Sequence, residues 1–201
     1  MTKKRLFLAV NLSLSTTRRI AEAMDQMRPV ARDKGMRIAW VPPENLHVTL
    51  KFLGWAAEEV VEAVRDRVRE LCVGKKGFEL VARGAGAFPN EAGARVLWVG
   101  VEDPSGALAA LAVDVEKAME RLGFEREGRA YSAHLTIGRV KEGKGAAEVL
   151  EPHRKTDFGR SHVGEVVLYE SIMKSTGSQY VPLVRVPLER SGRSRGEDEG
   201  E

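Results

Sequence analysis

Two four-residue stretches of the chain share one pattern of residue types. The first is His47-Val-Thr-Leu and the second is His134-Leu-Thr-Ile. Successive side chains of a strand point to opposite faces, so each histidine shares a face with the threonine two positions later. The aliphatic residues take the other face. Each stretch therefore predicts a half-buried strand that presents an imidazole and a hydroxyl group on one side.

Two imidazoles of this kind suit acid–base chemistry at phosphorus. In-line displacement at a phosphodiester needs one group to take a proton from the nucleophile and another to protonate the leaving oxygen. Imidazole titrates near pH ~6.5, so His47 and His134 can hold opposite protonation states, and each transfer contributes about 10²–10⁴-fold. Thr49 and Thr136 can donate to the non-bridging oxygens. We expect the two stretches to face each other across a phosphate.

A metal centre explains these residues less well. Each stretch offers one good ligand, whereas zinc sites take three or four from cysteine, histidine and carboxylates. His153 and His162 lie in polar segments that we expect to be exposed, and Cys72 falls on an apolar helix face. We therefore expect no metal and no other cofactor.

Composition limits the class of protein. The 201 residues are 43% hydrophobic and 30% charged, as in ordinary soluble domains, with a formal charge of +3 that suits an anionic partner. No apolar run approaches the length of about 20 residues that spans a membrane. A single cysteine excludes a disulfide within the chain and favours a reducing cytoplasm. We expect a cytoplasmic monomer with no obligate protein partner.

Periodicity predicts the elements that position the two stretches. Strands joined without helices imply antiparallel pairing. The halves repeat one order of elements around histidines that lie 87 positions apart, which predicts an α+β fold of two lobes related by a pseudo-twofold axis. Largely antiparallel sheets flanked by helices would then face a cleft between the lobes. The predicted strands cover residues 5–10, 36–41, 47–53, 78–88, 95–101, 133–140, 163–173 and 180–188, and the helices cover 15–34, 58–72, 103–122 and 146–153.

The chain divides into one folded domain and a tail. Residues 1–188 form the predicted bilobal domain. Residues 189–201 are arginine, serine, glycine and acidic residues, with no apolar side chain to bury. We expect this charged tail to be disordered.

Beyond the two stretches, the wider sequence resembles the two-histidine phosphoesterase superfamily, and within it the RNA 2′,3′-cyclic phosphodiesterases, also called 2′-5′ RNA ligases. The resemblance covers about residues 4 to 188 in the expected order. The matching stretches are Arg5-Leu-Phe-Leu-Ala-Val, Val41-Pro-Pro-Glu-Asn-Leu-His-Val-Thr-Leu-Lys-Phe-Leu-Gly, Gly86-Ala-Phe-Pro, Arg95-Val-Leu-Trp-Val-Gly and Ala133-His-Leu-Thr-Ile-Gly-Arg.

The resemblance implies metal-independent hydrolysis of RNA 2′,3′-cyclic phosphate ends to 2′-phosphomonoesters, with reversible 2′-5′ ligation as a second activity. It implies that His47 is the proton donor to the 3′ oxygen and His134 the proton acceptor from water. Pseudo-symmetry leaves either imidazole able to do either job. Thr49 and Thr136 would bind phosphate oxygens. The implied partner is RNA with cyclic phosphate ends, tRNA fragments included.

Two cations accompany the stretches. Arg139 matches the arginine that the family carries near the phosphate, although strict alternation from His134 places it on the opposite face. A bulge at Gly138 would bring it back. Lys51 lies four residues after His47 and shares its parity, so we predict that it adds positive potential to the cleft.

Other functions use the same residues differently. A second enzyme hypothesis changes the substrate to another cyclic nucleotide, an ADP-ribose cyclic phosphate or a 2′-5′ oligoadenylate. A third hypothesis is an RNA-binding or tRNA-handling protein with incidental hydrolysis. Aromatic residues can stack on unpaired bases, although most in strand patterns belong to a core. The candidates for stacking are Trp40, Phe88, Trp98, Phe124 and Tyr131.

Overall fold

Strands make up most of the fold. The computed structural model describes residues 3–174 and 177–190. Its strands are β1 (Lys3–Val10), β2 (Ile38–Trp40), β3 (Val48–Ala57), β4 (Phe78–Phe88), β5 (Ala94–Glu102), β6 (His134–Lys144), β7 (Asp157–Val163), β8 (Glu165–Lys174) and β9 (Gly177–Pro187). The helices are α1 (Leu14–Asp33), α2 (Glu58–Cys72), α3 (Ala107–Glu120) and α4 (Ala147–Leu150), with 3₁₀ turns at Pro43–Asn45 and Glu151–His153.

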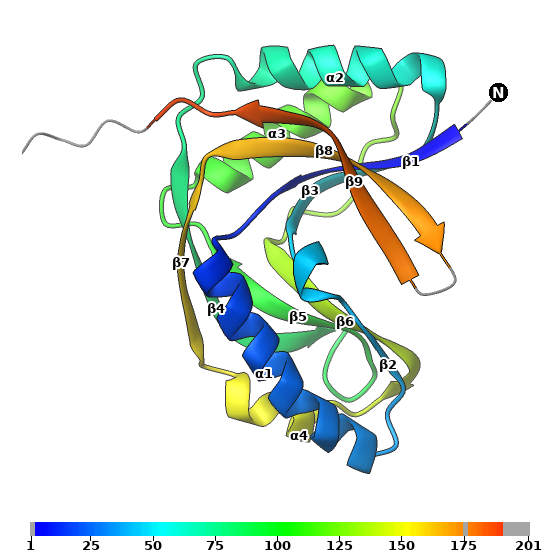
Figure 1. Cartoon of the computed structure of the whole chain (residues 1–201), viewed down its shortest axis with the longest axis vertical. Coiled ribbons are helices and arrows are strands. Elements are labelled where there is room, and N and C mark those ends of the chain that lie inside the picture. The colour runs from blue at the N-terminus through cyan, green and yellow to red at the C-terminus, as the bar shows by residue number, and fades with distance from the viewer. Residues whose placement is uncertain (1–2, 175–176, 191–201) are drawn as a thin grey trace, which may run out of the picture.

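The strands form one sheet in the order β7-β4-β5-β6-β3-β1-β8-β9, and β2 pairs with β6. Every pairing between these strands is antiparallel. The sheet has two halves, which we call the His47 half (β3, β1, β8 and β9) and the His134 half (β6, β5, β4 and β7). They meet where β3 pairs with β6 through Val48 and Leu135 (Figure 1). The predicted α+β fold, with largely antiparallel strands flanked by helices, is confirmed.

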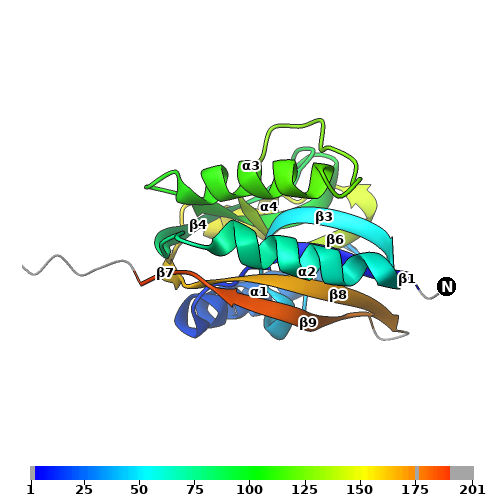
Figure 2. The ribbon, with the colours of Figure 1, turned by 90° about the horizontal axis from the view of Figure 1, so that it is seen from above.

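Helices cover the two halves separately. Helices α2 and α3 pack on each other and on the His47 half, and Figure 2 shows them side by side. Helix α1 leaves β1, crosses the molecule and packs on β7 and α4 in the His134 half (Figure 1). Helix α1 connects the two halves, because it packs on the His134 half whereas β1, which precedes it in the chain, belongs to the His47 half.

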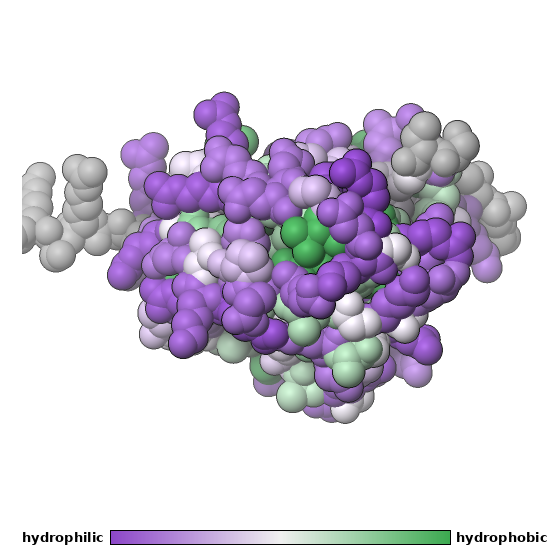
Figure 3. All heavy atoms as spheres, turned by 90° about the horizontal axis from the view of Figure 1, so that it is seen from below, coloured by the Kyte–Doolittle hydropathy of each residue, from purple (hydrophilic) through white to green (hydrophobic). Residues whose placement is uncertain are grey.

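Each helix buries one face at a spacing of three or four residues, as an amphipathic helix does. On α1 the buried side chains include Ile20, Met24 and Met27, and on α2 they include Val61, Val64 and Val68. A fully buried side chain of this size contributes roughly 1.5–3 kcal/mol. Polar residues cover the opposite faces, and Figure 3 shows a face of the molecule on which the strongest hydrophobic colour is confined to a small area.

Several elements differ from the predicted ones. Strand β3 continues past Gly54 to Ala57, and β6 continues to Lys144. The third helix begins at Ala107 and not at Asp103, because Gly106 has a φ of 72°, which a helix does not allow. The Asp103 carboxylate still accepts a hydrogen bond from the N–H of Ala109 at 3.0 Å. Strand β7 was missing from the prediction, since its sequence is polar. It buries Phe158 beneath α1 and pairs with β4.

The expectation that His153 is exposed is wrong. Its side chain belongs to the turn after α4 and is 7% exposed, with its ring 6.4 Å from that of Phe158. Burial lowers the pKa of His153. The polar neighbours in the sequence concealed this, since the ring is buried by packing between α4 and β7.

The end of the domain lies beyond the predicted boundary at 188. The backbone of Glu189 hydrogen-bonds with Lys75 and Gly77 after α2, so this residue belongs to the fold. Residues 191–201, on which most of the predicted disordered tail falls, lie outside the described residues. Within the described residues, no helix is long and apolar enough to cross a membrane.

Candidate active site

The junction of β3 and β6 brings the two motifs side by side. Val48 and Leu135 lie directly opposite each other, with no exposed surface. In an antiparallel pair the same register places the histidine of each motif opposite the threonine of the other. Opposite residues point to the same face of a sheet. All four polar side chains therefore share the face that the aliphatic pair does not use.

Both imidazoles are oriented by the same kind of hydrogen bond. Nδ1 of His47 lies 2.7 Å from the carbonyl oxygen of Asn45, and Nδ1 of His134 lies 2.8 Å from that of Ser132. A carbonyl can only accept, so Nδ1 carries the proton in each ring. Nε2 is then the nitrogen free for proton exchange. In His47 it lies 3.1 Å from Oγ1 of Thr49.

A cavity of about 230 Å³ opens on this face. The predicted residues His47, Thr49, Thr136 and Arg139 contribute to its wall. His134 does not line it, but it lies close enough that its charge acts on His47. The remaining lining residues are Arg5, Leu6, Phe7, Val41, Phe52, Ser171, Ser178 and Tyr180.

Aromatic rings surround the first imidazole. The ring of His47 lies 4.9 Å from Phe7 and 5.3 Å from Tyr180, the latter edge-on. Burial lowers the pKa of His47, the carbonyl of Asn45 opposes this shift, and the charge of His134 adds to it. These surroundings therefore favour the neutral imidazole.

A bulge follows the first motif in β3. Thr49 lies opposite Ala9 and Lys51 lies opposite Leu8, so Leu50 is an extra residue between two consecutive pairs. A bulge of one residue reverses the alternation of the strand beyond it. Beyond Leu50, counting alternate residues from His47 therefore no longer gives the face to which a side chain points.

A bulge follows the second motif at the same position in β6. Thr136 lies opposite Trp98 and Gly138 lies opposite Leu97, so Ile137 is the extra residue. Leu50 and Ile137 each come three residues after their histidine, so the two motifs have the same backbone irregularity. The bulge predicted near Gly138 is present, one residue earlier.

The bulges return the fifth residue after each histidine to the cavity face. Arg139 reaches the cavity in this way, as the resemblance implied. Strict alternation from His134 would have placed it on the opposite face. The equivalent residue in the first motif is Phe52, which also lines the cavity. At this equivalent position the two halves therefore present different groups to the cavity, a guanidinium from Arg139 and an aromatic ring from Phe52.

The predicted placement of Lys51 in the cleft is wrong. The bulge turns its side chain to the opposite face, where it is 6% exposed. Its ammonium group donates to the carboxylate of Glu116 on α3 at 2.6 Å and to the carbonyl of Glu125 at 2.8 Å. The same carboxylate accepts from the N–H of Glu127 at 2.9 Å. Lys51 thus fastens the loop between α3 and β6, which leads to His134.

Several lining residues were missed from the sequence because their position depends on pairing between distant strands. Arg5 and Phe7 alternate on β1, which was a local signal for one shared face. Ser171 on β8 lies opposite Tyr180 on β9, and nothing local indicates this pairing. None of the five predicted stacking candidates lines the cavity, although the ring of Phe88 meets that of His134 edge-on at 5.1 Å.

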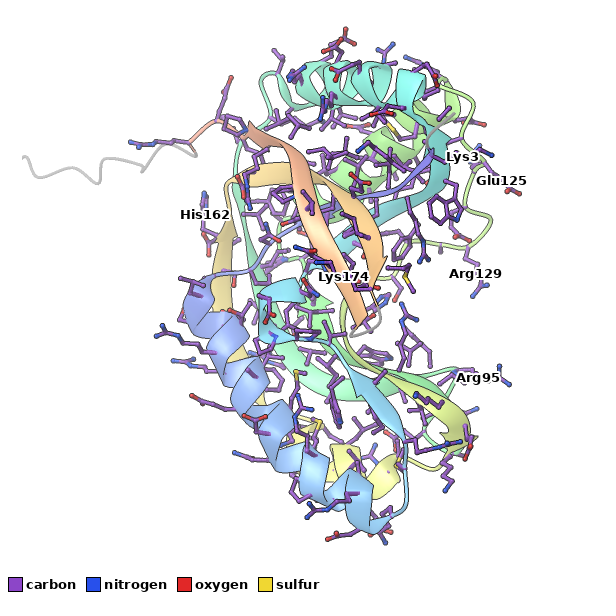
Figure 4. The ribbon with its side chains drawn as sticks, turned by 45° about the vertical axis from the view of Figure 1, so that its right-hand side comes forward. Lys3, Arg95, Glu125, Arg129, His162 and Lys174 are labelled. Carbon is purple, nitrogen blue, oxygen red and sulfur yellow. The ribbon has the colours of Figure 1, made fainter. Side chains whose placement is uncertain are left out.

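The other histidines lie elsewhere. Nδ1 of His162 on β7 is 2.8 Å from the carboxylate of Glu79, on the opposite side of Figure 4 from Lys3 and Arg129. Within residues 3–174 and 177–190, no three side chains of histidine, cysteine, aspartate or glutamate gather closely enough to hold a metal ion. The polar groups at the cavity wall are the imidazole of His47, hydroxyl groups and the guanidinium groups of Arg5 and Arg139, and the imidazole of His134 lies beside them.

Sequence comparison identifies the family to which the chain belongs. Residues 16–172 match the model of the 2′-5′ RNA ligase superfamily. The chain belongs to this superfamily. It is 34% identical over 180 residues to an RNA 2′,3′-cyclic phosphodiesterase of Archaeoglobus fulgidus, covering 89% of this chain and 97% of that one. A second protein of that name, from Methanothermobacter thermautotrophicus, is 34% identical over 184 residues, covering 90% and 97%.

Solved structures of other proteins share the architecture. LigT of Escherichia coli, crystallised with 3′-AMP, superposes with a TM-score of 0.77 at 26% identity, covering 93% of this chain and 99% of that one. TT0787 of Thermus thermophilus also gives a TM-score of 0.77 at 26% identity, covering 94% and 100%. The two-histidine fold expected from the motifs is therefore confirmed.

Proposed function

We propose that this protein is a phosphodiesterase that opens the 2′,3′-cyclic phosphate at an RNA end and leaves a 2′-phosphomonoester. The observation that carries the proposal is the pairing of β3 with β6, which presents two oriented imidazoles and two threonine hydroxyls on one face. The substrate is proposed from the relatives, which bear the name RNA 2′,3′-cyclic phosphodiesterase.

In the proposed reaction, water attacks phosphorus while the bond to the 3′ oxygen breaks. Nε2 of His134 takes a proton from the attacking water, and Nε2 of His47 gives a proton to the departing 3′ oxygen. One P–O bond forms and one breaks, so no redox partner is required. The hydroxyls of Thr49 and Thr136 and the guanidinium of Arg139 hold the non-bridging oxygens, where negative charge develops. Lys51 has no direct part, because its ammonium is held by Glu116.

The proton-donor role of His47 requires its pKa to rise when substrate binds. Burial lowers this pKa, whereas a phosphate anion against the ring would favour the protonated form. Binding therefore prepares the acid. With a 5′-terminal hydroxyl as the nucleophile in place of water, the same two rings can open the cyclic phosphate to a 2′-5′ phosphodiester and a free 3′ hydroxyl. The reverse of that step cleaves the linkage, so reversible 2′-5′ ligation belongs to the proposal.

The test is hydrolysis of a short RNA that ends in a 2′,3′-cyclic phosphate, in excess EDTA, followed by ³¹P NMR. We expect a 2′-phosphomonoester, with no activity from a double variant that lacks both histidines. Loss of activity in chelator would contradict the metal-free mechanism, and a 3′-phosphate would contradict the assigned leaving oxygen. A parallel panel of another cyclic nucleotide, ADP-ribose cyclic phosphate and 2′-5′ oligoadenylate separates the alternative substrates, which we expect to react more slowly.

We further propose that the enzyme acts as a monomer in the reducing cytoplasm. Its one cysteine, Cys72, is buried on α2 and cannot form a disulfide within the chain. Burial raises the pKa of this thiol to about 11, which leaves it unreactive. Sedimentation at micromolar concentration tests the oligomeric state.

A further inference from the structure

Strand β3 exposes two large aromatic side chains beyond its motif. Phe52 is 60% exposed and Trp55 is 64% exposed. Residues three apart on a regular strand point to opposite faces. Here Leu6 lies opposite Gly54 and Phe7 lies opposite Phe52, so a second bulge falls at Leu53. It brings both exposed rings to the face of the cavity.

This aromatic surface is continuous with the cavity. Phe52 lines the cavity wall, and the ring of Phe7, which also contacts His47, lies 5.9 Å from it. Trp55 lies opposite Arg5 in the pairing of β3 with β1, and Arg5 lines the cavity too. The guanidinium of Arg5 also donates to the sulfur of Met173, at 3.8 Å. We call Phe52, Trp55, Arg5 and Met173 the outer shelf.

The outer shelf carries uncompensated positive charge. Neither Arg5 nor Lys3 takes part in an ion pair within the described residues. Lys3 lies two residues before Arg5 on the same face of β1, at the start of that strand (Figure 4). The acidic Glu170 is occupied by Lys4, which points to the other face. Aromatic rings with free cations between them suit a polyanion that carries flat bases.

Resting on the proposed function, we propose that the outer shelf binds the nucleotide that precedes the cyclic-phosphate nucleotide in an RNA strand. Its base stacks on Trp55, and its phosphate meets Arg5 and Lys3. Single-stranded RNA is bound in this manner by aromatic and arginine planes, without dependence on base identity. The substrate class is then the end of an oligonucleotide and not a free cyclic mononucleotide.

The spacing along β1 supports a separate subsite. Phe7, against the His47 ring, and Arg5, opposite Trp55, are two residues apart, which is about 7 Å along a strand. A terminal nucleotide in the cavity therefore leaves Trp55 free for the next base.

The experiment compares kcat/KM for a cyclic mononucleotide with that for a dinucleotide ending in a cyclic phosphate. We expect the wild type to prefer the dinucleotide. Trp55→Ala should leave mononucleotide turnover within about twofold and lower dinucleotide turnover by about 5- to 100-fold, the range for loss of one stacked base. Trp55→Phe should retain most of the preference. Leu14→Ala removes a side chain on α1 that is 77% exposed, and it should change the turnover of neither substrate.

A dinucleotide with an abasic sugar at the first position is the matched control on the substrate. The wild type should turn over this abasic dinucleotide no faster than the mononucleotide. Trp55→Ala should lower its turnover no further. Equal turnover of the intact and abasic substrates would overturn the subsite, as would an equal loss on both substrates in Trp55→Ala. A change of oligomeric state in Trp55→Ala would show that the outer shelf contacts a second copy instead. If the wild type hydrolyses neither cyclic phosphate, the proposed function fails, whereas hydrolysis without a preference defeats only the subsite.

Discussion

His47 and His134 occupy equivalent places in the two halves of the sheet, but their surroundings differ. Each ring donates from Nδ1 to the carbonyl two residues earlier, and each motif is followed by a bulge at the third residue. His47 lies among Phe7 and Tyr180, whereas His134 meets Phe88. A symmetric backbone thus carries asymmetric side chains.

The residues after the bulges show what the asymmetry does. At the fifth position the His47 half has Phe52 and the His134 half has Arg139, and both line the cavity. At the fourth position one half has the buried Lys51 and the other has Gly138. In the reaction proposed above, this position would offer a guanidinium to the phosphate in one half and an aromatic ring to a base in the other. We propose that this difference orients the substrate and so assigns different roles to the two imidazoles.

Removal of either imidazole should have the largest effect. His47→Ala and His134→Ala should each lower kcat/KM by about 10²–10⁴-fold, because each loses one proton transfer. Steady-state kinetics measure this, with circular dichroism to show that the fold remains. Retention of more than a tenth of the activity by either folded variant would remove that histidine from the mechanism.

A sulfur substitution separates the acid from the base. A thiolate leaves without a proton, so a substrate with sulfur at the 3′ bridging position does not need the acid. His47→Ala should recover most of its activity on this substrate, and His134→Ala should not. The opposite result would exchange the two roles.

The buried ion pair behind the first motif should govern stability. Lys51→Met leaves the Glu116 carboxylate partly buried without its partner, which costs on the order of 3 kcal/mol of unfolding free energy, near the low end for such pairs. Urea unfolding measures it. Lys75→Met breaks the more exposed pair with Asp114 and should cost less than about 1 kcal/mol. Equal losses in both variants would contradict the anchoring role.

Arg139 should matter for chemistry and not for folding. Arg139→Ala removes a charged hydrogen bond to the phosphate and should lower kcat/KM by about 10- to 100-fold. Arg139→Lys keeps the charge without the forked donors and should lie between. Arg95→Ala, on β5 and outside the cavity wall, is the matched control (Figure 4). An unchanged Arg139→Ala would make the arginine a surface residue.

The smallest expected effect is on the pH dependence of stability. Burial lowers the pKa values of His47 and His153, so the unfolded chain binds more protons than the folded one. Stability should be complete above pH 6.5, fall as the pH drops below that value, and level off below the lowered pKa values. Each group contributes a slope of at most about 1.4 kcal/mol per pH unit. Urea unfolding of His47→Gln and His153→Gln should each show a shallower slope than the wild type.

Much of the fold was local enough to predict. Alternation in the two motifs fixed which side chains shared a face, because a strand repeats every two residues. Helix α2 was predicted with its observed ends, since its apolar residues recur every three or four positions between charged ones. Helix α3 was less well predicted, because the backbone conformation of Gly106 sets its first residue. Strand β7 was missed, because it depends on the packing of Phe158 under α1.

By itself the sequence determined the two motifs, their chemistry and the α+β class. Tertiary structure alone decided how the motifs met and what surrounded them. The parity that made Lys51 a cleft residue and excluded Arg139 holds only up to the first bulge. A bulge is set by register with a partner strand, as in the pairing of β3 with β1 and of β6 with β5. Pairing between strands distant in sequence therefore decided which cation faces the cavity.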